Sequence, residues 1–307
     1  MKTVKKILCV IDPTAEVQTA RDRAAMLAKA FNAELRLYIA YYNAYLPDVA
    51  AGASTAAKSL SNEAIEVLQR NLDEMADELR GQGLEVTTKA EWNASLYDSV
   101  IDEAKSVGAD LVVKDTHYHT AISRALFTNT DWNLIRKCPV PLWLVKPNVT
   151  YEGRPGILAC VDPLHEHDKP ASLDDEILKA GGMLSEVLGG TLHAFHAFSP
   201  LIEIARAAKW AVKPVRLPVE ELSERMRKAH AEAFSELTER HGIPGGQRLL
   251  KTGPVETVLA ATITELGASL AIMGAVTRRK FRKMLIGSTA EKVMDHISCD
   301  LLVLKPD

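Results

Sequence analysis

Short apolar runs alternate with longer amphipathic stretches along the 307 residues of the chain. In the first half the apolar runs have the length of strands, and they predict strands at residues 7–11, 34–40, 85–89, 111–114 and 142–145. The amphipathic stretches between them predict helices at residues 15–30, 61–80, 96–107 and 131–137. Because a helix separates each strand from the next, we expect a parallel sheet with right-handed crossovers and helices on both faces.

The second half shows the same alternation. Its apolar runs predict strands at residues 157–161, 191–195, 247–251, 270–273 and 301–304. Its amphipathic stretches predict helices at residues 174–188, 219–240, 255–266 and 289–297. A long apolar connection, residues 197–218, contains a short predicted helix at residues 201–210. Two interpretations of this connection stay open, an apolar pocket for a small molecule and a packing surface.

The two halves also repeat in sequence. The run KILCVIDP at residues 6–13 returns as GILACVDP at residues 156–163, and LWLVKP at residues 142–147 returns as LLVLKP at residues 301–306. A repeat of this length indicates a duplicated domain and not a solenoid. We therefore expect two domains, residues 1–150 and residues 151–307, joined by a linker rich in turn-forming residues.

Composition limits the classes of function. The chain has 37 basic and 40 acidic residues and is 47% hydrophobic, so a general affinity for nucleic acid or for a membrane surface is not expected. The N-terminal apolar run is too short for a signal peptide or a membrane span. The four cysteines lie in or beside apolar runs without a CxxC pair, which predicts reduced core residues of a cytoplasmic protein.

The stretch with the clearest chemistry is GAVTRRKFRKMLIGST, residues 274–289. It follows a predicted buried strand and ends where a helix is predicted to begin. Glycines allow close backbone approach, hydroxyl groups donate hydrogen bonds, and a helix N-terminus presents free N–H groups, so the stretch suits a phosphate group. It matches neither GxGxxG nor GxxxxGK[ST]. The alternative is a connecting loop whose basic residues are solvated.

The spacing of Gly274, Thr277, Gly287 and Ser288 resembles the G-x2-G-x9-G-[ST] nucleotide loop of the universal stress protein family. Thr277 departs from that pattern, which has glycine there. The stretches KDTHYHTAISR, TNTDWNLIRKCPVPLWLVKP and ISCDLLVLKPD resemble the tandem E type of the family. This resemblance covers almost the whole chain. It implies two Rossmann-like α/β domains of the adenine nucleotide alpha hydrolase type, each a five-stranded parallel sheet, packed as a pseudo-dimer.

The resemblance also implies a ligand and its site. In the second domain the site residues would be Asp162, Gly253, Gly274, Thr277, Arg278, Gly287, Ser288 and Thr289. Asp162 would contact a nucleoside and the loop would hold its phosphates, as expected at the carboxyl ends of the first and fourth strands. Asp162 is followed by Pro163, however, so it equally suits a turn, and the pair Gly253-Pro254 equally suits a helix start.

The first domain lacks the loop. At an offset of 159 residues, Asp115, Tyr118, Thr128 and Asn129 stand at the positions of Gly274, Thr277, Gly287 and Ser288. Each change opposes the close approach of a phosphate, so we expect the first domain not to bind ATP in the manner of the family.

His117 and His119 suggest a zinc site, because in an extended segment both side chains project to the same side. Two ligands alone do not make a zinc site, and the alternative is a polar loop whose histidines meet solvent or form hydrogen bonds.

The sequence contains no GxSxG or HExxH motif, which favours a binding protein over an enzyme. The expected function is that of a cytoplasmic stress-response protein that binds ATP with magnesium, or a related phosphorylated metabolite, in its second domain. Its other partners would be proteins, and it would be a monomer built as a pseudo-dimer or a homodimer. Two alternatives stay open: an interaction protein or an apolar or metal ligand binder that has lost the nucleotide site, and a slow ATPase.

Overall fold

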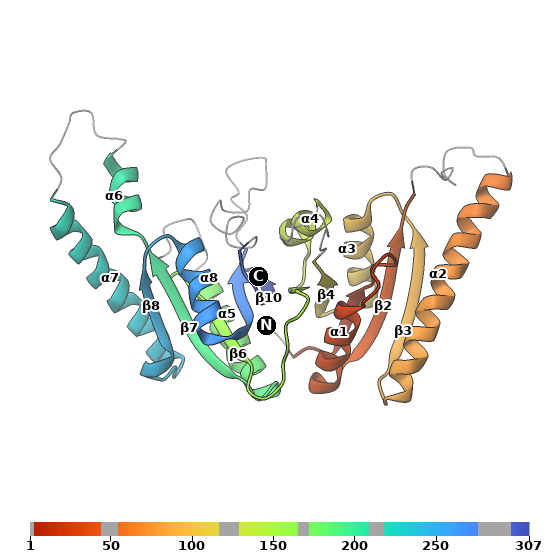
Figure 1. Ribbon diagram of the computed structural model, residues 1–307, viewed down its shortest axis with the longest axis horizontal. Helices are drawn as coiled ribbons and strands as arrows, with labels where there is room; N and C mark the ends of the chain where they lie inside the picture. Colours follow the sequence, from red (N-terminus) through yellow and green to blue (C-terminus); the bar gives the residue numbers. More distant parts are fainter. Residues whose placement is uncertain are drawn as a thin grey trace. The chain divides into compact units, whose positions relative to one another are not determined.

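The computed structural model of the protein describes residues 3–43, 55–116, 129–164, 172–208, 218–275 and 296–306. The chain divides into two compact units, Lys2–Pro147 and Asn148–Asp307, called here the N-terminal and the C-terminal unit. Each unit is a Rossmann-like α/β domain built on five parallel strands, so the predicted fold class is confirmed (Figure 1).

In the N-terminal unit the strands lie in the order β3-β2-β1-β4-β5. Their bounds are β1 (Lys6–Val10), β2 (Glu34–Tyr41), β3 (Val86–Trp92), β4 (Leu111–Asp115) and β5 (Leu142–Val145). The helices are α1 (Thr19–Phe31), α2 (Thr55–Gly81), α3 (Leu96–Val107) and α4 (Asn129–Lys137). β1 and β4 are neighbours, which places the reversal of strand order where the sequence predicted it.

Helices cover both faces of this sheet. α1 and α2 lie on one face and meet through the ion pair between Arg21 and Glu78, at 3.1 Å. α3 and α4 lie on the other face, where the Lys137 ammonium donates to the Tyr97 hydroxyl at 3.0 Å. The alternation of side chains along a strand produces this division, because successive residues point to opposite faces.

The C-terminal unit has the same order of strands, β8-β7-β6-β9-β10. Their bounds are β6 (Gly156–Cys160), β7 (Thr191–Phe198), β8 (Arg248–Thr252), β9 (Ala268–Gly274) and β10 (Asp300–Leu304). The helices are α5 (Ser172–Val187), α6 (Pro200–Ala208), α7 (Val219–Arg240) and α8 (Val255–Leu266), with a 3-10 turn at Gly245–Gln247. The helix predicted at residues 289–297 falls almost entirely outside the described residues.

α5 and α7 share one face of this second sheet, where Asp175 of α5 pairs with Arg240 of α7 at 2.8 Å. α8 lies on the opposite face. Lys251 of β8 pairs with Glu265 of α8 at 3.7 Å. The preceding residue, Leu250, is in register with His196, which contacts α7. Successive residues of a strand point to opposite faces, so α7 and α8 cover different faces of the sheet. α6 and α7 both lie between β7 and β8 in the chain, where the N-terminal unit has α2 alone between β2 and β3 among its described residues.

The core of each unit consists of its central strands, which are apolar on both faces. Ile7, Leu8 and Cys9 of β1 are completely buried, as are Ile157 and Leu158 of β6. Continuous apolar runs are typical of parallel strands covered on both faces.

One helix begins later than its hydrophobic pattern predicted. A turn at residues 13–14 and a bend at residues 16–17 precede α1. Asp12 stabilises the turn by accepting hydrogen bonds from the Thr14 amide at 2.8 Å and the Thr14 hydroxyl at 2.7 Å. Gln18 closes the turn by donating to the carbonyl of Asp12 at 2.9 Å. Short polar side chains that bind the nearby backbone compete with helix formation, and here they delay it to Thr19.

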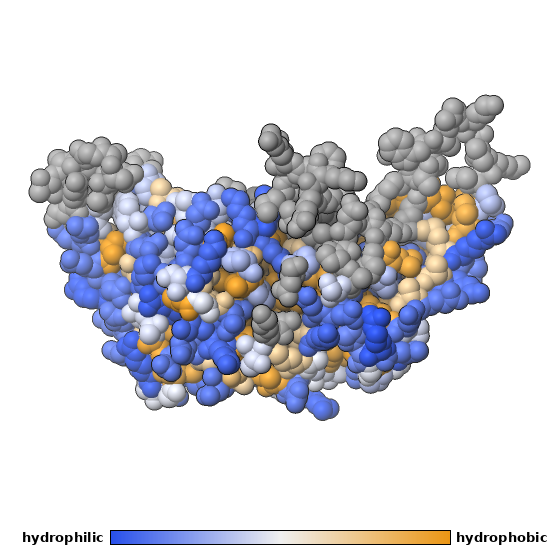
Figure 2. Space-filling view, turned by 180° about the vertical axis from the view of Figure 1, so that it is seen from behind, coloured by the Kyte–Doolittle hydropathy of each residue, from blue (hydrophilic) through white to orange (hydrophobic). Residues whose placement is uncertain are grey.

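The described part of the surface in Figure 2 is mainly hydrophilic, with apolar residues in small patches. Among the described residues, no helix is both long enough and apolar enough to cross a membrane.

Candidate functional site

The candidate site of the C-terminal unit lies where β6 and β9 end. These strands are parallel neighbours, and Ala159 of β6 is in register with Ile272 of β9. Continuing this register puts Asp162 beside the chain that leaves β9 at Gly274. The structure therefore brings together two of the predicted site residues, at the crevice that the strand order creates.

The backbone that carries Asp162 is fixed from two sides. Its amide donates to the carboxylate of the buried Asp174, in the first turn of α5, at 3.1 Å. The carbonyl of the preceding Val161 lies 3.0 Å from Nδ1 of the buried His196. The side chain of Asp162 itself is partly exposed. The chain thus fixes the backbone that carries this side chain, and the residue stays partly exposed to solvent.

Gly274 is required by packing, which the sequence did not indicate. A Cβ atom there would lie 2.6 Å from Cδ2 of Leu173 and 3.3 Å from Cδ1 of Ile177, both buried in α5. In the N-terminal unit the burial pattern of α1 puts Ala20 and Ala24 at the places of these two residues, and Asp115 stands at the position of Gly274. The larger side chain therefore lies on the helix in the C-terminal unit, as Leu173, and on the strand in the N-terminal unit, as Asp115.

Gly253 also has a backbone reason to be glycine. Its φ is +141°, in the region that glycine adopts easily, and a Cβ would lie 2.9 Å from Cγ1 of Val258. The following Pro254 precedes α8, which begins at Val255 and not at the proline. Gly253 lies at the same edge of the sheet as Asp162, after β8, and its amide donates to the carbonyl of Phe198 at 2.9 Å.

The remaining predicted site residues lie outside the described ranges. For the phosphate loop these are Thr277, Arg278, Gly287, Ser288 and Thr289, and for the zinc site they are His117 and His119. Within the described ranges, no three His, Cys, Asp or Glu side chains are grouped so that they could hold a metal ion.

Sequence reasoning missed a thiol at the floor of this site. Cys160, the last residue of β6, is partly exposed, whereas Cys9, Cys138 and Cys299 are buried. It therefore departs from the prediction that all four cysteines are core residues. The last registered pair of β6 and β9 is Ala159 with Ile272, so continuing the register by one residue puts Cys160 opposite Met273. Burial raises the pKa of the Cys9 thiol well above its ordinary value, with a smaller contribution from Asp115. Cys160 is therefore the more accessible of the two thiols.

A second missed feature is a pair of buried histidines on the face of the same sheet that α5 and α7 cover. Nε2 of His196 lies 2.8 Å from Nδ1 of His230 on α7, and the ring of Phe198 stacks on His230 with centroids 4.3 Å apart. Since Nδ1 of His196 faces the Val161 carbonyl, that nitrogen carries a proton. The pair links α7 to the strand end that carries Asp162.

The N-terminal unit has a crevice at the corresponding place, at the carboxyl ends of β1 and β4. It is lined by Asp12, Lys114 and Thr130 together with apolar side chains. The buried Lys114 ammonium pairs with the carboxylate of Asp131 on α4 at 2.8 Å and donates to the carbonyl of Asp115 at 2.8 Å. This ion pair joins residues 17 positions apart, and no local pattern marks it.

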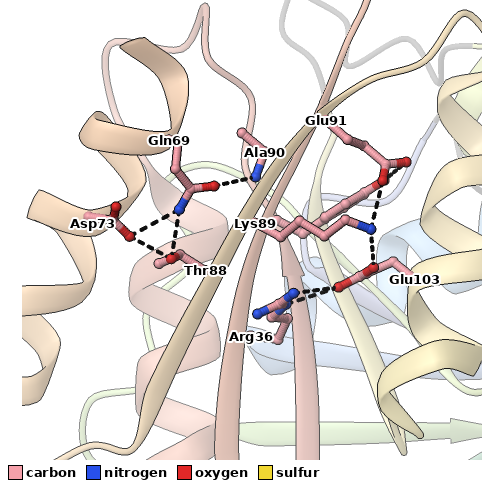
Figure 3. A network of polar contacts seen from close by, with 9 residues as sticks. Arg36, Gln69, Asp73, Thr88, Lys89, Ala90, Glu91 and Glu103 are labelled. Carbon is pink, nitrogen blue, oxygen red and sulfur yellow. Dashed lines mark hydrogen bonds and ion pairs between the residues drawn. The ribbon is translucent and has the colours of Figure 1, made fainter. Parts of the chain in front are cut away.

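A network of charged side chains lies on the same face of the N-terminal sheet (Figure 3). The buried Glu103 carboxylate of α3 accepts from Arg36 at 2.9 Å and from Lys89 at 2.6 Å. Lys89 also pairs with Glu91 at 2.6 Å, and Glu91 accepts from the hydroxyl of the buried Tyr38 at 2.7 Å. Charges that are removed from water need such partners.

The network shifts the proton affinities of its members. Burial, and then the hydrogen bond to Glu91, raises the pKa of Tyr38 above its ordinary value. Burial alone would raise the pKa of Glu91, but hydrogen bonds from Lys89 and Tyr38 outweigh it and lower that pKa. Burial alone would lower the pKa of Lys89, but Glu103 and Glu91 together raise it.

Comparison with known proteins places this architecture. The sequence model of the universal stress protein family matches residues 3–146 and residues 157–305. Universal stress protein E of Escherichia coli is 28% identical over 316 residues, which cover 100% of this chain and 96% of that protein. The universal stress protein E homolog of Haemophilus influenzae is 27% identical over 307 residues, or 98% of this chain and 97% of that protein.

Solved structures share this architecture. A functionally unknown protein from Pseudomonas aeruginosa is 26% identical, with a TM-score of 0.75 over 99% of this chain and 93% of that one. A universal stress protein from Archaeoglobus fulgidus, 15% identical with a TM-score of 0.68 over 98% of both chains, shares the fold. Because the family model matches both halves of the sequence, the chain belongs to the universal stress protein family and carries two of its domains in tandem, with full-length similarity to the E type.

Proposed function

We propose that the protein is a cytoplasmic stress-response regulator whose C-terminal unit binds ATP, with magnesium, or a related phosphorylated metabolite. The observation that carries this proposal is the position of Asp162. Its carboxylate is partly exposed at the end of β6, and β9 beside it leads at Gly274 into the loop with the nucleotide-loop spacing. A carboxylate at this place suits the hydroxyl groups of a ribose, and the loop suits phosphate.

In this proposal the site residues divide the ligand between them. Asp162 holds the nucleoside and Gly253 shapes the wall of the crevice. The backbone at Gly274 and Gly287 approaches the phosphates, Ser288 and Thr289 donate to them, and Arg278 supplies the nearest positive charge. Thr277 replaces a small residue by a larger one, so phosphate is expected to bind with the loop displaced around it.

The first predicted domain, residues 1–150, is proposed to have lost this function, whereas the second, residues 151–307, has kept it. Asp115 stands where the second unit has Gly274, and the Lys114–Asp131 ion pair lies beside it. Binding in one unit alone would then change how the protein contacts other proteins. The proposal needs no catalytic base, and it does not require ATP to be hydrolysed.

A thermal-shift titration with MgATP tests the proposal, using the wild type and Gly287→Glu. A ligand present at about 100 times its Kd stabilises the native state by about 2.7 kcal/mol, which raises Tm by several degrees. The wild type is expected to show this shift and Gly287→Glu is not. If neither protein shifts, the nucleotide proposal is wrong and the non-nucleotide interaction protein becomes the better account.

A matched control keeps that result interpretable. Thr128→Glu makes the corresponding change in the N-terminal unit, at the position 159 residues earlier. It is expected to leave the MgATP shift intact. Phosphate release in proportion to protein concentration, abolished by Gly287→Glu, would instead indicate a slow ATPase.

A further inference from the structure

β3 and β8 are edge strands at corresponding places of the two units (Figure 1). In both strands the odd-numbered residues bond to the neighbouring strand: the Asn93 amide donates to the Tyr41 carbonyl, and the Gly253 amide donates to the Phe198 carbonyl. The backbone groups of the even-numbered residues therefore point away from the sheet. A row of such free groups is a template for another strand unless side chains cover it.

Side chains of α2 cover the edge of β3. The Arg80 guanidinium donates to the Val86 carbonyl from two nitrogens, at 3.0 Å and 2.7 Å. The side-chain carbonyl of Gln69 accepts from the Ala90 amide at 2.7 Å, and its amide group donates to the Thr88 hydroxyl at 2.9 Å (Figure 3). A strand added to this edge would have to break these bonds, so the N-terminal unit is protected against edge pairing.

The edge of β8 has no comparable cover within the described ranges. No described side chain bonds to the outward backbone groups of Arg248, Leu250 or Thr252, although the Arg248 amide donates to the Gly245 carbonyl of the 3-10 turn. Leu250 is partly exposed and Thr252 is exposed. The Arg248 carbonyl and both backbone groups of Leu250 and Thr252 are therefore available to a further strand.

These backbone groups are complementary to those of a second copy. When two β8 strands lie antiparallel about a two-fold axis at Leu250, the amide of each Leu250 donates to the carbonyl of the other. The Thr252 amide of each copy meets the Arg248 carbonyl of the other. The one outward amide that is already bonded, that of Arg248, lies at the end of this ladder, so every central group finds a partner.

The side chains also suit this pairing. Leu250 lies opposite Leu250, Arg248 opposite Thr252, and Leu249 opposite Lys251, so no like charges face each other directly. Lys251 is balanced within its own copy by Glu265, at 3.7 Å.

From the uncovered edge and its complementarity to itself, we infer that β8 is an interface between two copies of this chain, paired antiparallel about Leu250. The C-terminal sheets of the two copies then continue into each other, and the covered β3 edges stay unpaired. The backbone of β8 is open to an extended segment of any protein, but the side-chain pairing fits a second copy.

Sedimentation velocity on the full chain tests whether the dimer exists. Concentrations up to about 200 µM are needed, because a pair of five-residue strands is a small and weak interface. The wild type is expected to change from monomer to dimer over this range. Leu250→Lys should weaken the association at least about fivefold, because it puts two ammonium groups directly opposite each other.

Disulfide trapping tests the register, in a Cys160→Ser background that removes the partly exposed native thiol. Leu250→Cys is expected to cross-link to itself on mild oxidation, because facing residues of a hydrogen-bonded pair have Cα atoms about 5.5 Å apart, within the range of a disulfide. Arg248→Cys and Thr252→Cys should each fail to cross-link alone, since like positions are then about 14 Å apart. A mixture of these two variants should form a mixed disulfide.

Thr88→Cys is the matched control, because Thr88 is the central outward residue of the covered edge of β3. It should give no disulfide under the same conditions. The inference is overturned if the wild type stays monomeric at every concentration, which would leave the edge to another protein. It is also overturned if the wild type dimerises but Leu250→Cys does not cross-link, or if Arg248→Cys cross-links to itself as readily. Neither readout uses MgATP, so the result is independent of ligand binding by the C-terminal unit.

Discussion

The two units share a fold but differ in how they fill the face of the sheet that carries α3 or α8. In the N-terminal unit this face holds Arg36, Lys89 and Glu103 in one ion-paired network. In the C-terminal unit the strand registers put His193 at the place of Arg36 and Leu249 at the place of Lys89. The equal lengths of α3 and α8 put Thr262 at the place of Glu103. Thr262 satisfies its hydroxyl within α8, by donating to the Val258 carbonyl at 2.7 Å.

The ends of the central strands differ in the same direction. Lys114 and Asp131 form a buried ion pair in the first unit, where the second unit has Met273 and Ala290 in its sequence. The lesson is that one backbone supports either charged or neutral side chains on the same face, provided that all members of a network change together. A buried charge without its partner is costly, whereas a complete pair and an apolar replacement are comparable in stability.

The largest effect is expected for Asp131→Ala. Among the partners that the described residues supply, it leaves the buried Lys114 ammonium the carbonyl of Asp115, which should cost about 3 to 5 kcal/mol of unfolding free energy. Denaturant unfolding followed by tryptophan fluorescence measures it, since three of the four tryptophans, among them the buried Trp143, belong to this unit. Adding Lys114→Met should restore most of the loss. If the double variant is as unstable as the single one, the ion pair does not explain the cost.

Glu103→Thr is expected to have the next largest effect, about 2 to 3 kcal/mol, because it removes the shared partner of Arg36 and Lys89. These two cations are partly exposed, so water compensates some of the loss. Adding Arg36→His and Lys89→Leu transfers the residues of the C-terminal unit and should recover stability in the same unfolding assay. A cost below about 0.5 kcal/mol for Glu103→Thr would mean that solvent screens the network.

Gly274→Ala tests the packing of the C-terminal unit, with an expected loss of about 1 to 3 kcal/mol from overpacking against Leu173. Combined with Leu173→Ala, which imitates Ala20 of the N-terminal unit, it should be tolerated better than by itself. Denaturant unfolding of both variants, followed by circular dichroism, gives the two free energies. Equal losses with and without Leu173→Ala would show that helix packing is not the reason for this glycine.

The smallest effect concerns pH. The pKa of Glu91 is lowered in the folded protein, so its contribution to stability is present above its unfolded pKa, about 4.3, and is lost as the pH falls through the lower folded value. Glu91→Gln should therefore flatten the decline in stability below about pH 4.3, by less than about 1 kcal/mol because the group is partly exposed. Unfolding curves from pH 3 to pH 7 measure the slope. An unchanged slope would assign the decline to other carboxylates.

Much of the fold follows from local sequence features. α3, α7 and α8 have the bounds that their hydrophobic patterns predict. Gly108 and Gly267, which end α3 and α8, adopt the left-handed conformation with φ of +65° and +57°. The start of α1 was placed too early because the competing turn at Asp12 depends on side-chain hydrogen bonds and not on hydrophobic period.

The candidate site was less accessible to sequence reasoning. The adjacency of Asp162 and Gly274 followed from strand order alone. The packing of Gly274 against Leu173 and the pairing of Lys114 with Asp131 are tertiary contacts between different elements, and no spacing in the sequence encodes them. The internal repeat supplies part of this information, because aligning the two halves shows at which positions a charged side chain in one unit corresponds to a neutral one in the other, or a large side chain to a small one.

The most direct test of the account compares thiol protection in the two crevices. Cys160 is the partly exposed cysteine of the chain, and Val10 occupies the corresponding position in the N-terminal unit. MgATP is expected to slow the alkylation of Cys160 in the wild type and not in Gly287→Glu. With the thiol moved by Cys160→Ser and Val10→Cys, MgATP is expected to leave the rate unchanged. Protection of the thiol introduced by Val10→Cys, or no protection of Cys160, would contradict the claim that the C-terminal unit alone holds the phosphorylated ligand.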